Sequence, residues 1–320
     1  MQMGYDVKSD DIFNWEIALA AQTACILEAD APKPGNVNRY YDFNDATLED
    51  FHLSALAIGR PFGYIQSLGV GKTVLEAVRA VRALVATNTN LGILLLLAPL
   101  ALAWSQICAG INRRAGGRER NIQDAQFSYG LGSSVSVREW QGLWKTEVQR
   151  VLDRLTAEDT AFVYQAIREA SPAGMGKVAQ YDINEQAPSI TLLEAMKSAA
   201  ARDLIAQQYA DGFSLVLGQG REMFSAALKK RLSLPEAIKE TFLFLLSLNA
   251  DSLISRKLGP QRSEEIRQLA LSVRKGQMCV NELDRILRSE KHALNPGTTA
   301  DLTTAVVFVQ LLEDNIFRIR

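Results

Sequence analysis

The chain has 320 residues, long enough for one large domain or two ordinary ones, so burial of a hydrophobic core is not limiting. Its 35 Lys and Arg balance 36 Asp and Glu to a net charge of -1, which argues against nucleic acid as a partner, because binding its phosphates needs excess positive charge. The two histidines lie far apart without neighbours at zinc-ligand spacing, so any metal should be oxygen-ligated, which favours Mg²⁺.

The cysteines and the apolar runs indicate in which cellular compartment the protein is expected. Cys25, Cys108 and Cys279 stand alone in the sequence, as is typical of free thiols in a reducing compartment. The N-terminus lacks the pattern of a secretory signal. The apolar run at residues 91–103 is shorter than the roughly 20 residues that a membrane span requires. We therefore expect a cytoplasmic protein without a membrane partner, in which this run forms a buried helix.

Apolar residues recur at helical spacing along most of the chain. The expected helices cover residues 15–26 (ending before Pro32), 48–58, 74–86, 91–109, 140–152, 159–170, 191–205, 235–257, 263–273, 280–287 and 300–312. No segment alternates β-branched residues between turn signals, so we expect no sheet. The sequence predicts one large all-α domain over residues 1–320, built around a buried apolar helix, with a polar, Gly-rich loop or lid insertion at residues 110–136.

Residues 69–73 (Gly-Val-Gly-Lys-Thr) are similar to the end of a phosphate-binding loop. The full motif also needs a glycine where Gln66 stands and a buried strand before the loop. Residues 58–67 instead indicate the end of a helix and a turn. We therefore interpret Gly71 and Thr73 as residues that mark the start of the next helix.

Three Asn- and Gly-containing turns stand in front of apolar helices, and the first is Pro-Lys-Pro-Gly-Asn-Val-Asn at residues 32–38. Two prolines stiffen the backbone around Lys33, and Gly35 allows another group to approach closely. Asn36 and Asn38 add amide donors and acceptors. A plain turn explains the prolines and the glycine but not the lysine with both amides, which favours a binding role.

Asp42 and Asp45 follow this first turn. Their spacing would suit a hydrated Mg²⁺, but they would equally serve to cap the helix that starts at Leu48. The sequence leaves both interpretations open.

The second turn, Thr-Asn-Thr-Asn at residues 87–90, precedes the most apolar helix of the chain. One cap uses fewer polar residues than this, and the dipole end of a buried helix is poorly screened. Asn88, Thr89, Asn90 and Gly92 are therefore candidates for ligand binding, with plain capping as an equal alternative.

The third turn, Asn-Pro-Gly-Thr-Thr-Ala-Asp at residues 295–301, contributes Gly297 and Asp301. Asp301 lies three residues after Thr298, the spacing of a capping box, so capping is a strong alternative for it. The first turn of a helix offers unpaired N–H groups and a positive dipole end. Three such turns meeting in one fold would make a polyphosphate site built largely from backbone.

Asp251 lies in an otherwise apolar helical segment, with Arg256 close by. A buried carboxylate must be paired or coordinated, because burying an unpaired charge is costly. A structural pair with Arg256 is one interpretation, and a functional carboxylate is the other. Carboxylates in apolar settings cluster at functional sites, which favours the second. Arg202 and Asp203 raise the same alternatives.

Taken in order, these motifs resemble those of the triphosphoribosyl-dephospho-CoA synthase family over nearly the whole chain. The resemblance rests on Pro32–Gly35, Asp45 ahead of Phe51 and Ser54-Ala55, Asn88-Thr89 ahead of Gly92, Ala173-Gly174-Met175-Gly176, Asp251-Ser252 followed by Arg256, and Pro296-Gly297 ahead of Ala300-Asp301-Leu302. Members of this family are all-helical and make the precursor of the prosthetic group of citrate or malonate lyase.

The resemblance implies ATP and 3′-dephospho-CoA as substrates, with Mg²⁺ accompanying the ATP. The 2′-hydroxyl of the acceptor would attack C1′ of the ATP ribose, and adenine would leave while the triphosphate stays attached. The implied roles are phosphate binding for Lys33, Asn88 and Thr89, magnesium or base duty for Asp45 and Asp251, phosphate binding or orientation of Asp251 for Arg256, and ribose or metal-water positioning for Asp301. Gly35, Asn36, Asn38, Asn90, Gly92 and Gly297 would complete the nucleotide-binding turns.

The sequence departs from the family pattern in two places. Asn90-Leu91 stands where the family usually has His-Lys, and Gly176-Lys177 stands where Gly-Glu is common. These changes resemble a branch found with tetrahydromethanopterin- or methanofuran-dependent one-carbon metabolism. A relative that acts on another nucleotide or phosphorylated substrate is thus a second hypothesis, and a non-catalytic helical binding protein is a third. A homodimer is left open.

Overall fold

The computed structural model describes residues 13–114, 137–170, 189–290 and 292–314, and every element within them is helical, as predicted. The first half contains α1 (Trp15–Asp30), α2 (Leu48–Ala57), α3 (Gly59–Gly63), α4 (Ile65–Arg82), α5 (Leu91–Arg114), α6 (Val137–Asp153) and α7 (Ala157–Ala170). The second half contains α8 (Leu192–Ala199), α9 (Leu204–Asp211), the short π-helix η1 (Val216–Gly220), α10 (Arg221–Lys229), α11 (Leu234–Leu248), α12 (Ser252–Leu258), α13 (Pro260–Arg274), α14 (Val280–Arg288) and α15 (Gly297–Asp314).

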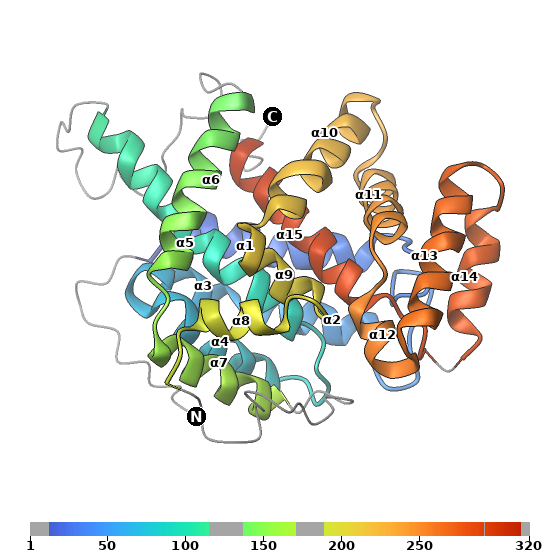
Figure 1. Cartoon of the computed structure of the whole chain (residues 1–320), viewed down its shortest axis with the longest axis horizontal. Helices are drawn as coiled ribbons and strands as arrows, with labels where there is room; N and C mark the ends of the chain where they lie inside the picture. Colours follow the sequence, from blue (N-terminus) through green and yellow to red (C-terminus); the bar gives the residue numbers. More distant parts are fainter. Residues whose placement is uncertain (1–12, 115–136, 171–188, 291, 315–320) are drawn as a thin grey trace.

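Helix α5 is the buried apolar helix that the sequence predicts. Leu94, Leu97 and Leu100 are fully buried, and the helix packs against α4, α6 and α15 (Figure 1). By length and composition Leu91–Ile111 would suffice to cross a membrane, but 78% of its most apolar window is buried inside the protein. Its apolar surface is therefore used for packing within the fold.

Helix α15 is the second central helix, and it carries one of the predicted turns at its start. Val306, Phe308 and Val309 are fully buried where α15 packs against α1, α5 and α11. Its N-terminal end runs toward α12 and its C-terminal end toward α6 and α10 (Figure 1). The start of α15 is thereby brought close to segments more than 200 residues away in the sequence.

Helices α11 to α14 enclose a smaller apolar cluster at one end of the molecule (Figure 1). Phe242 and Leu246 of α11 meet Ile266 of α13 and Leu287 of α14. Helix α14 is strongly amphipathic, and its buried Leu283 and Leu287 are one helical turn apart. This end of the fold supports the start of α12, which faces α15.

Two helices expected from the sequence are each divided by an aspartate. The segment at residues 191–205 breaks after Ala199, and Asp203 caps α9. The segment at residues 235–257 breaks after Leu248, and Asp251 caps α12. An Asp side chain accepts first-turn N–H groups and so starts a new helix where hydrophobic periodicity alone predicts continuation.

Other differences concern glycine-containing segments. Residues 58–67, expected to be a helix end and a turn, form α3 and the start of α4. Helix α4 kinks at Gly69 (φ 71°), and Gly71 then packs on Asp159 of α7 and donates its N–H to Asp159 Oδ1 at 2.9 Å. The Gly-Lys-Thr segment therefore serves helix packing and not phosphate binding.

Two parts of the sequence prediction fall partly or wholly outside the described residues. The first five residues of the expected loop or lid at 110–136 extend α5, and the rest lies outside. The motif at residues 173–176 and Lys177 also lie outside. In contrast, η1 and α10 were not predicted, because Gly212, Gly218 and Gly220 interrupt the helical periodicity there.

Candidate active site

The three Asn- and Gly-containing turns all reach one large cavity, of about 1070 Å³. The candidate residues that line it are Lys33, Asn36, Asp45, Asn88, Thr89, Asn90, Gly92, Arg256, Gly297 and Asp301. Gly35, Asn38 and Asp251 are not among the lining residues. Segments separated by up to 268 positions in the sequence (Lys33 to Asp301) thus share one wall.

Four helices present their N-terminal ends to this cavity. Gly92 of α5, Ile205 of α9, Leu253 of α12 and Gly297 of α15 lie in or next to a first turn and line the cavity. Each N-terminal end carries partial positive charge from the aligned peptide dipoles. Carboxylates already cap part of them, because Asp203 caps α9 while Asp251 caps α12 and bonds the Thr299 N–H of α15. An anionic ligand such as phosphate would therefore bind at the first-turn N–H groups that remain free.

Asp301 faces the cavity from near the start of α15. Its carboxyl group accepts no hydrogen bond from the residues that the structure describes. Removal from bulk water raises the pKa of Asp301 well above its ordinary value, the carboxylates of Glu28, Asp251 and Asp203 raise it further, and Arg256 opposes them. A carboxyl group with raised proton affinity and no protein partner is suited to exchanging a proton with a substrate.

Gly92 creates the space for the Asp301 carboxyl group. A Cβ atom at position 92 would overlap Asp301 Oδ2 and would also meet Ile205 Cδ1 at 2.8 Å. The first turn of α5 therefore needs a residue without a side chain to let the carboxyl group lie against it. The capping-box alternative for Asp301 is not formed, because α15 already begins at Gly297, before Thr298, and the Asp301 carboxyl group accepts no N–H group of the described residues.

Asp251 is fully buried and joins two helix N-termini. Its Oδ1 accepts the N–H groups of Leu253 (2.9 Å) and Ile254 (3.2 Å), and its Oδ2 accepts the Thr299 N–H (2.7 Å) and hydroxyl (2.8 Å). The expected pair with Arg256 is not formed, since Arg256 lies 3.8 Å from Asp203 Oδ2. Four donors occupy the four lone-pair sites of a carboxylate, so this geometry gives Asp251 a structural role and leaves no oxygen site for a metal.

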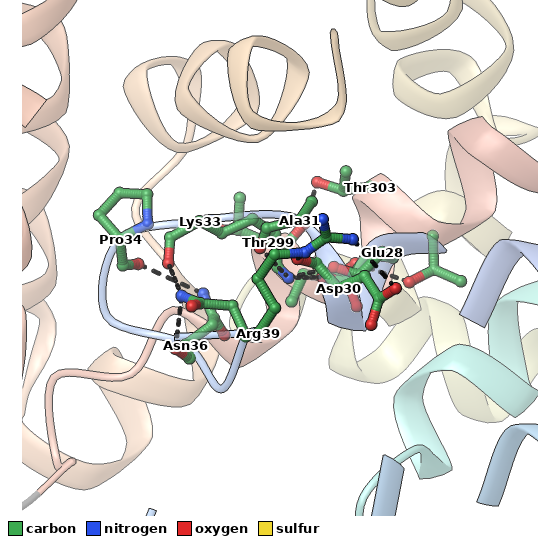
Figure 2. Close-up of polar contacts among 12 residues, drawn as sticks. Glu28, Asp30, Ala31, Lys33, Pro34, Asn36, Arg39, Thr299 and Thr303 are labelled. Atoms are coloured by element: carbon green, nitrogen blue, oxygen red, sulfur yellow. Dashed lines mark hydrogen bonds and ion pairs between the residues drawn. The ribbon is translucent and has the colours of Figure 1, made fainter. Parts of the chain in front are cut away.

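Lys33 lies in the cavity wall, but its ammonium group points to the end of α1 (Figure 2). Nζ donates to the backbone oxygens of Glu28 and Ala31 and lies 3.1 Å from Glu28 Oε1. Two of these contacts are hydrogen bonds, and the contact with Glu28 Oε1 is an ion-pair distance without a hydrogen bond. The side chain is 1% exposed, so in this geometry it caps the C-terminal end of α1, where positive charge is favourable, instead of reaching for phosphate.

The other residues of the first turn divide between lining the cavity and supporting the turn. Gly35 has φ 76° and lies against Leu287 of α14, which is the close approach that its sequence position predicts. Asn38 is buried and its Nδ2 donates to the backbone oxygens of Lys33 (3.2 Å) and Asn36 (3.3 Å), which closes the turn. Of the two amides, only Asn36 lines the cavity.

The second turn combines capping with unfilled hydrogen-bonding capacity. Asn88 Oδ1 accepts the Leu91 N–H at 3.1 Å, and the Thr89 hydroxyl bonds the Ser54 hydroxyl of α2 at 2.5 Å. Asn90 is buried, and its Nδ2 has no hydrogen-bond partner in the described part of the chain. The capping interpretation is thus confirmed for Asn88, and Asn90 offers a free donor, while ligand binding by this turn stays a prediction.

Buried polar atoms without partners recur around the cavity. Besides Asn90, they include Thr87 Oγ1, His292 Nδ1 and Asn295 Oδ1, all in lining residues. Burying a polar group without a hydrogen bond costs free energy, so such groups are normally satisfied by a ligand or water. Their location indicates a polar ligand bound between the second and third turns.

Asp45 lies at the exposed edge of the cavity, and the preceding Asp42 has a different role. Asp42 Oδ1 accepts the Leu48 N–H at 2.8 Å, so Asp42 caps α2 together with the capping box of Thr47 and Asp50. Asp45 makes no hydrogen bond or ion pair within the described residues. Of the two alternatives left open for this pair, capping thus applies to Asp42, and the Asp45 carboxylate is available.

Sequence reasoning missed several lining residues. Glu28 lies seven residues after Ala21 on the inner face of α1, and that spacing was the available signal. Arg82 and Lys257 add positive charge to the lining, beside Arg202, which the sequence had already raised as a candidate. Phe43 stacks on His292 with ring centroids 4.0 Å apart, a contact that no sequence pattern indicated.

Comparison with known proteins gives the class to which this fold and cavity belong. The sequence pattern of a family of transferases matches residues 14–317, almost the whole chain. The chain belongs to this family, which is described as ATP:dephospho-CoA triphosphoribosyl transferase (CitG).

A solved structure supports the same assignment. The chain is similar to a crystal structure provisionally named triphosphoribosyl-dephospho-CoA synthase from Archaeoglobus fulgidus, with 26% sequence identity and a TM-score of 0.56. The match covers 81% of this chain and 97% of the other. A search of curated proteins finds no significant match. The family expected from the sequence motifs is thus confirmed, and with it the transferase class.

Proposed function

We propose that the protein transfers the triphosphoribosyl group of ATP to the 2′-hydroxyl of 3′-dephospho-CoA and releases adenine. The observation that carries this proposal is that the three predicted turns and the unpartnered Asp301 carboxyl group meet at one cavity. The cavity volume of about 1070 Å³ lies at the upper end of the roughly 300–1,000 Å³ typical of ligand sites, which is large enough for a nucleotide-sized ligand.

In this reaction a bond forms between the acceptor 2′-oxygen and ribose C1′, and the bond from C1′ to adenine N9 breaks. The hydroxyl proton passes to a base, and the departing adenine takes a proton from water. Asp301, in its carboxylate form, is our candidate for the base, because raised proton affinity makes a carboxylate a stronger base. Helix N-termini facing the triphosphate hold the reacting ribose in place.

The triphosphate needs more positive charge than helix dipoles supply. Four cationic side chains of the lining are exposed and can turn to phosphate oxygens: Arg82, Arg202, Arg256 and Lys257.

The described residues contain no group of three or more His, Cys, Asp or Glu side chains that could hold a metal. Mg²⁺ is usually held by one or two carboxylates together with substrate phosphates and water, so the unpaired Asp45 fits. Bound there, Mg²⁺ would neutralise triphosphate charge.

The direct test is to incubate the protein with ATP, Mg²⁺ and dephospho-CoA and to measure free adenine by chromatography. We expect adenine to appear in equal amount to a triphosphoribosyl adduct of the acceptor. Omission of dephospho-CoA should prevent adenine release, because we expect water not to attack ribose C1′ in place of the acceptor hydroxyl. Absence of adenine over a range of pH and Mg²⁺ concentration would contradict the proposal.

A second candidate function is the same type of transfer to another phosphorylated or nucleotide acceptor, and Asn90 favours it. Its unpartnered Nδ2 and the buried Leu91 occupy the positions of the family His-Lys pair, so the cavity has lost a positive charge there. A thermal-shift screen separates the two candidates, because a ligand raises the melting temperature only if it binds the folded state. ATP should stabilise the protein in both cases, and dephospho-CoA only in the first.

Substitution of Gly92 by alanine should reduce adenine release and stability together. In a helix, Gly→Ala normally stabilises by roughly 0.5–1 kcal/mol, but here the new Cβ would displace the Asp301 carboxyl group. Gly110 is a matched control on the same helix, since a Cβ there meets nothing within 4 Å. Gly110→Ala should show the normal gain with full activity. Chemical denaturation measures the stability of each variant, and initial rates measure its adenine release. If Gly92→Ala and Gly110→Ala change both quantities equally, the role of Gly92 is refuted.

A further inference from the structure

The α1–α2 loop (residues 31–47) forms one wall of the cavity without being helical itself. Three of its side chains that line the cavity are Asn36, Phe43 and Asp45. Within the loop, Asn38 and Tyr41 exchange two backbone hydrogen bonds, both of 3.0 Å. These local bonds determine the shape of the loop but not where it lies relative to the cavity. Contacts with other elements must determine that position.

Helix α14 holds the start of this loop through one pair of charged side chains. Asp284 Oδ1 accepts the Gly35 N–H at 2.8 Å, and both oxygens of Asp284 lie 2.9 Å from Arg288 Nε, which donates to them. Arg288 Nη2 donates to the backbone oxygen of Asn36 at 2.8 Å. The pair thus binds one donor and one acceptor on consecutive residues of the loop, which fixes both the position and the direction of its backbone.

The same part of the chain contacts the loop at two further places. The Arg288 guanidinium group lies over the Tyr41 ring, with Cζ 4.3 Å from the ring centroid. After the end of α14, His292 stacks on Phe43 with ring centroids 4.0 Å apart. Phe43 begins the hydrogen-bonded turn that carries Asp45. The loop is therefore attached to α14 and the residues after it along most of its length.

Neither Asp284 nor Arg288 lines the cavity. Their side chains are 20% and 16% exposed, and within the described residues every hydrogen bond and ring contact that they make outside α14 goes to the loop. Apart from the long-range effect of its charges, the pair can therefore influence a bound ligand only through the loop.

We propose that Asp284 and Arg288 are positioning residues that fix the α1–α2 loop at the cavity wall and thereby determine how tightly the protein binds Mg·ATP. The role in binding rests on the proposed function, in which Asp45 holds Mg²⁺ beside the triphosphate, but the attachment of the loop does not. A loop that is already fixed loses little freedom when a ligand binds, so more of the contact free energy of Asn36 and Asp45 appears as affinity.

The test is Arg288→Met, which removes the guanidinium group but keeps a long side chain. We expect faster amide hydrogen exchange at residues 35–41, because the loop loses its attachment to α14 while the rest of the fold keeps its bonds. The KM for Mg·ATP should rise by about 10–100-fold, the usual effect of removing a group that orients a metal ligand. In contrast, kcat and the KM for the acceptor should change little.

Arg285→Met is the matched control. It removes a positive charge from the same last turn of α14, but the Arg285 side chain is exposed and makes no hydrogen bond or ion pair with the described part of the chain. Both hydrogen exchange and the KM for Mg·ATP should therefore stay at their wild-type values. An equal rise of this KM in Arg285→Met would show an effect of charge instead of position and would overturn the proposal.

Asp284→Asn is the second variant, and it keeps the test decisive if Arg288→Met folds poorly. Its amide oxygen can still accept the Gly35 N–H, but it lacks the charge that holds Arg288. It should show the same changes as Arg288→Met with smaller size. Unchanged exchange at residues 35–41 in the folded variants overturns the attachment of the loop.

The two readouts separate this proposal from the proposed function. If the wild type releases no adenine, the proposed function fails, while hydrogen exchange still tests the attachment of the loop. In an active enzyme, faster exchange at residues 35–41 with an unchanged KM for Mg·ATP overturns the role of Asp284 and Arg288 in nucleotide binding. A purely structural pair would lower the melting temperature without separating the KM for Mg·ATP from kcat.

Discussion

Asp301→Asn should lower the rate of adenine release by about 10²–10⁴-fold, which is the contribution usual for a general base. Asparagine has nearly the same shape as aspartate, so it should fit against Gly92 and keep the cavity intact. It cannot accept the hydroxyl proton of the acceptor. The measurement is the initial rate of adenine release with saturating ATP and acceptor, over a pH series.

The stability of Asp301→Asn should not fall at neutral pH. The wild-type carboxyl group carries a cost there, since its raised pKa means that folding disfavours ionisation. ATP should therefore still raise the melting temperature of the variant. Asp42→Asn, a change at an exposed helix cap, is the control and should release adenine at the normal rate. A normal rate in Asp301→Asn would show that another group takes the proton.

Asp251→Ala should be the most destabilising single change at this end of the fold. It removes the caps of α12 and α15 together, and loss of one cap costs about 0.5–2 kcal/mol. The Thr299 hydroxyl and N–H would also be left buried without an acceptor, which costs a further 1–3 kcal/mol, roughly. Denaturant unfolding should therefore show a loss of about 3 kcal/mol or more.

Asp251→Asn distinguishes the two caps. The asparagine oxygen can still accept the N–H groups of Leu253 and Ile254, but its NH₂ group would face the donors of Thr299. Its loss of stability should lie between those of the wild type and Asp251→Ala. At temperatures well below its melting temperature, the Asp251→Asn variant should release adenine at a rate within a few-fold of the wild-type rate. Severe loss of activity in a folded Asp251→Asn would restore the catalytic role that its sequence context suggested.

Hydrophobic periodicity predicted most helices but not the positions at which two of them are divided. Helices α1, α5 and α15 follow directly from their apolar faces, because burying such a face dominates helix stability in proteins. At Asp203 and Asp251 the apolar pattern continues while the backbone does not. Those breaks depend on first-turn N–H groups being capped, which periodicity does not report.

The same distinction applies to the site residues. Turn composition singled out residues that do line the cavity, among them Asn36, Asn90 and Asp301, but it did not separate them from residues that only cap a helix, such as Asp42. It also singled out Lys33, which the fold directs to Glu28. A sequence shows that a charge is present but not which partner lies within reach, and for a buried charge the partner determines the role.

The sequence by itself determined the all-α class, the central helix α5 and the family, because these depend on periodicity and motif order along the chain. Only the tertiary structure decided that Asp251 is a double cap, that Lys33 fixes Glu28, and that Asp301 lies against Gly92. The physical reason is that hydrogen bonding and desolvation act over a few ångströms. Residues more than 200 positions apart come within that range only when α1, α5 and α15 pack together.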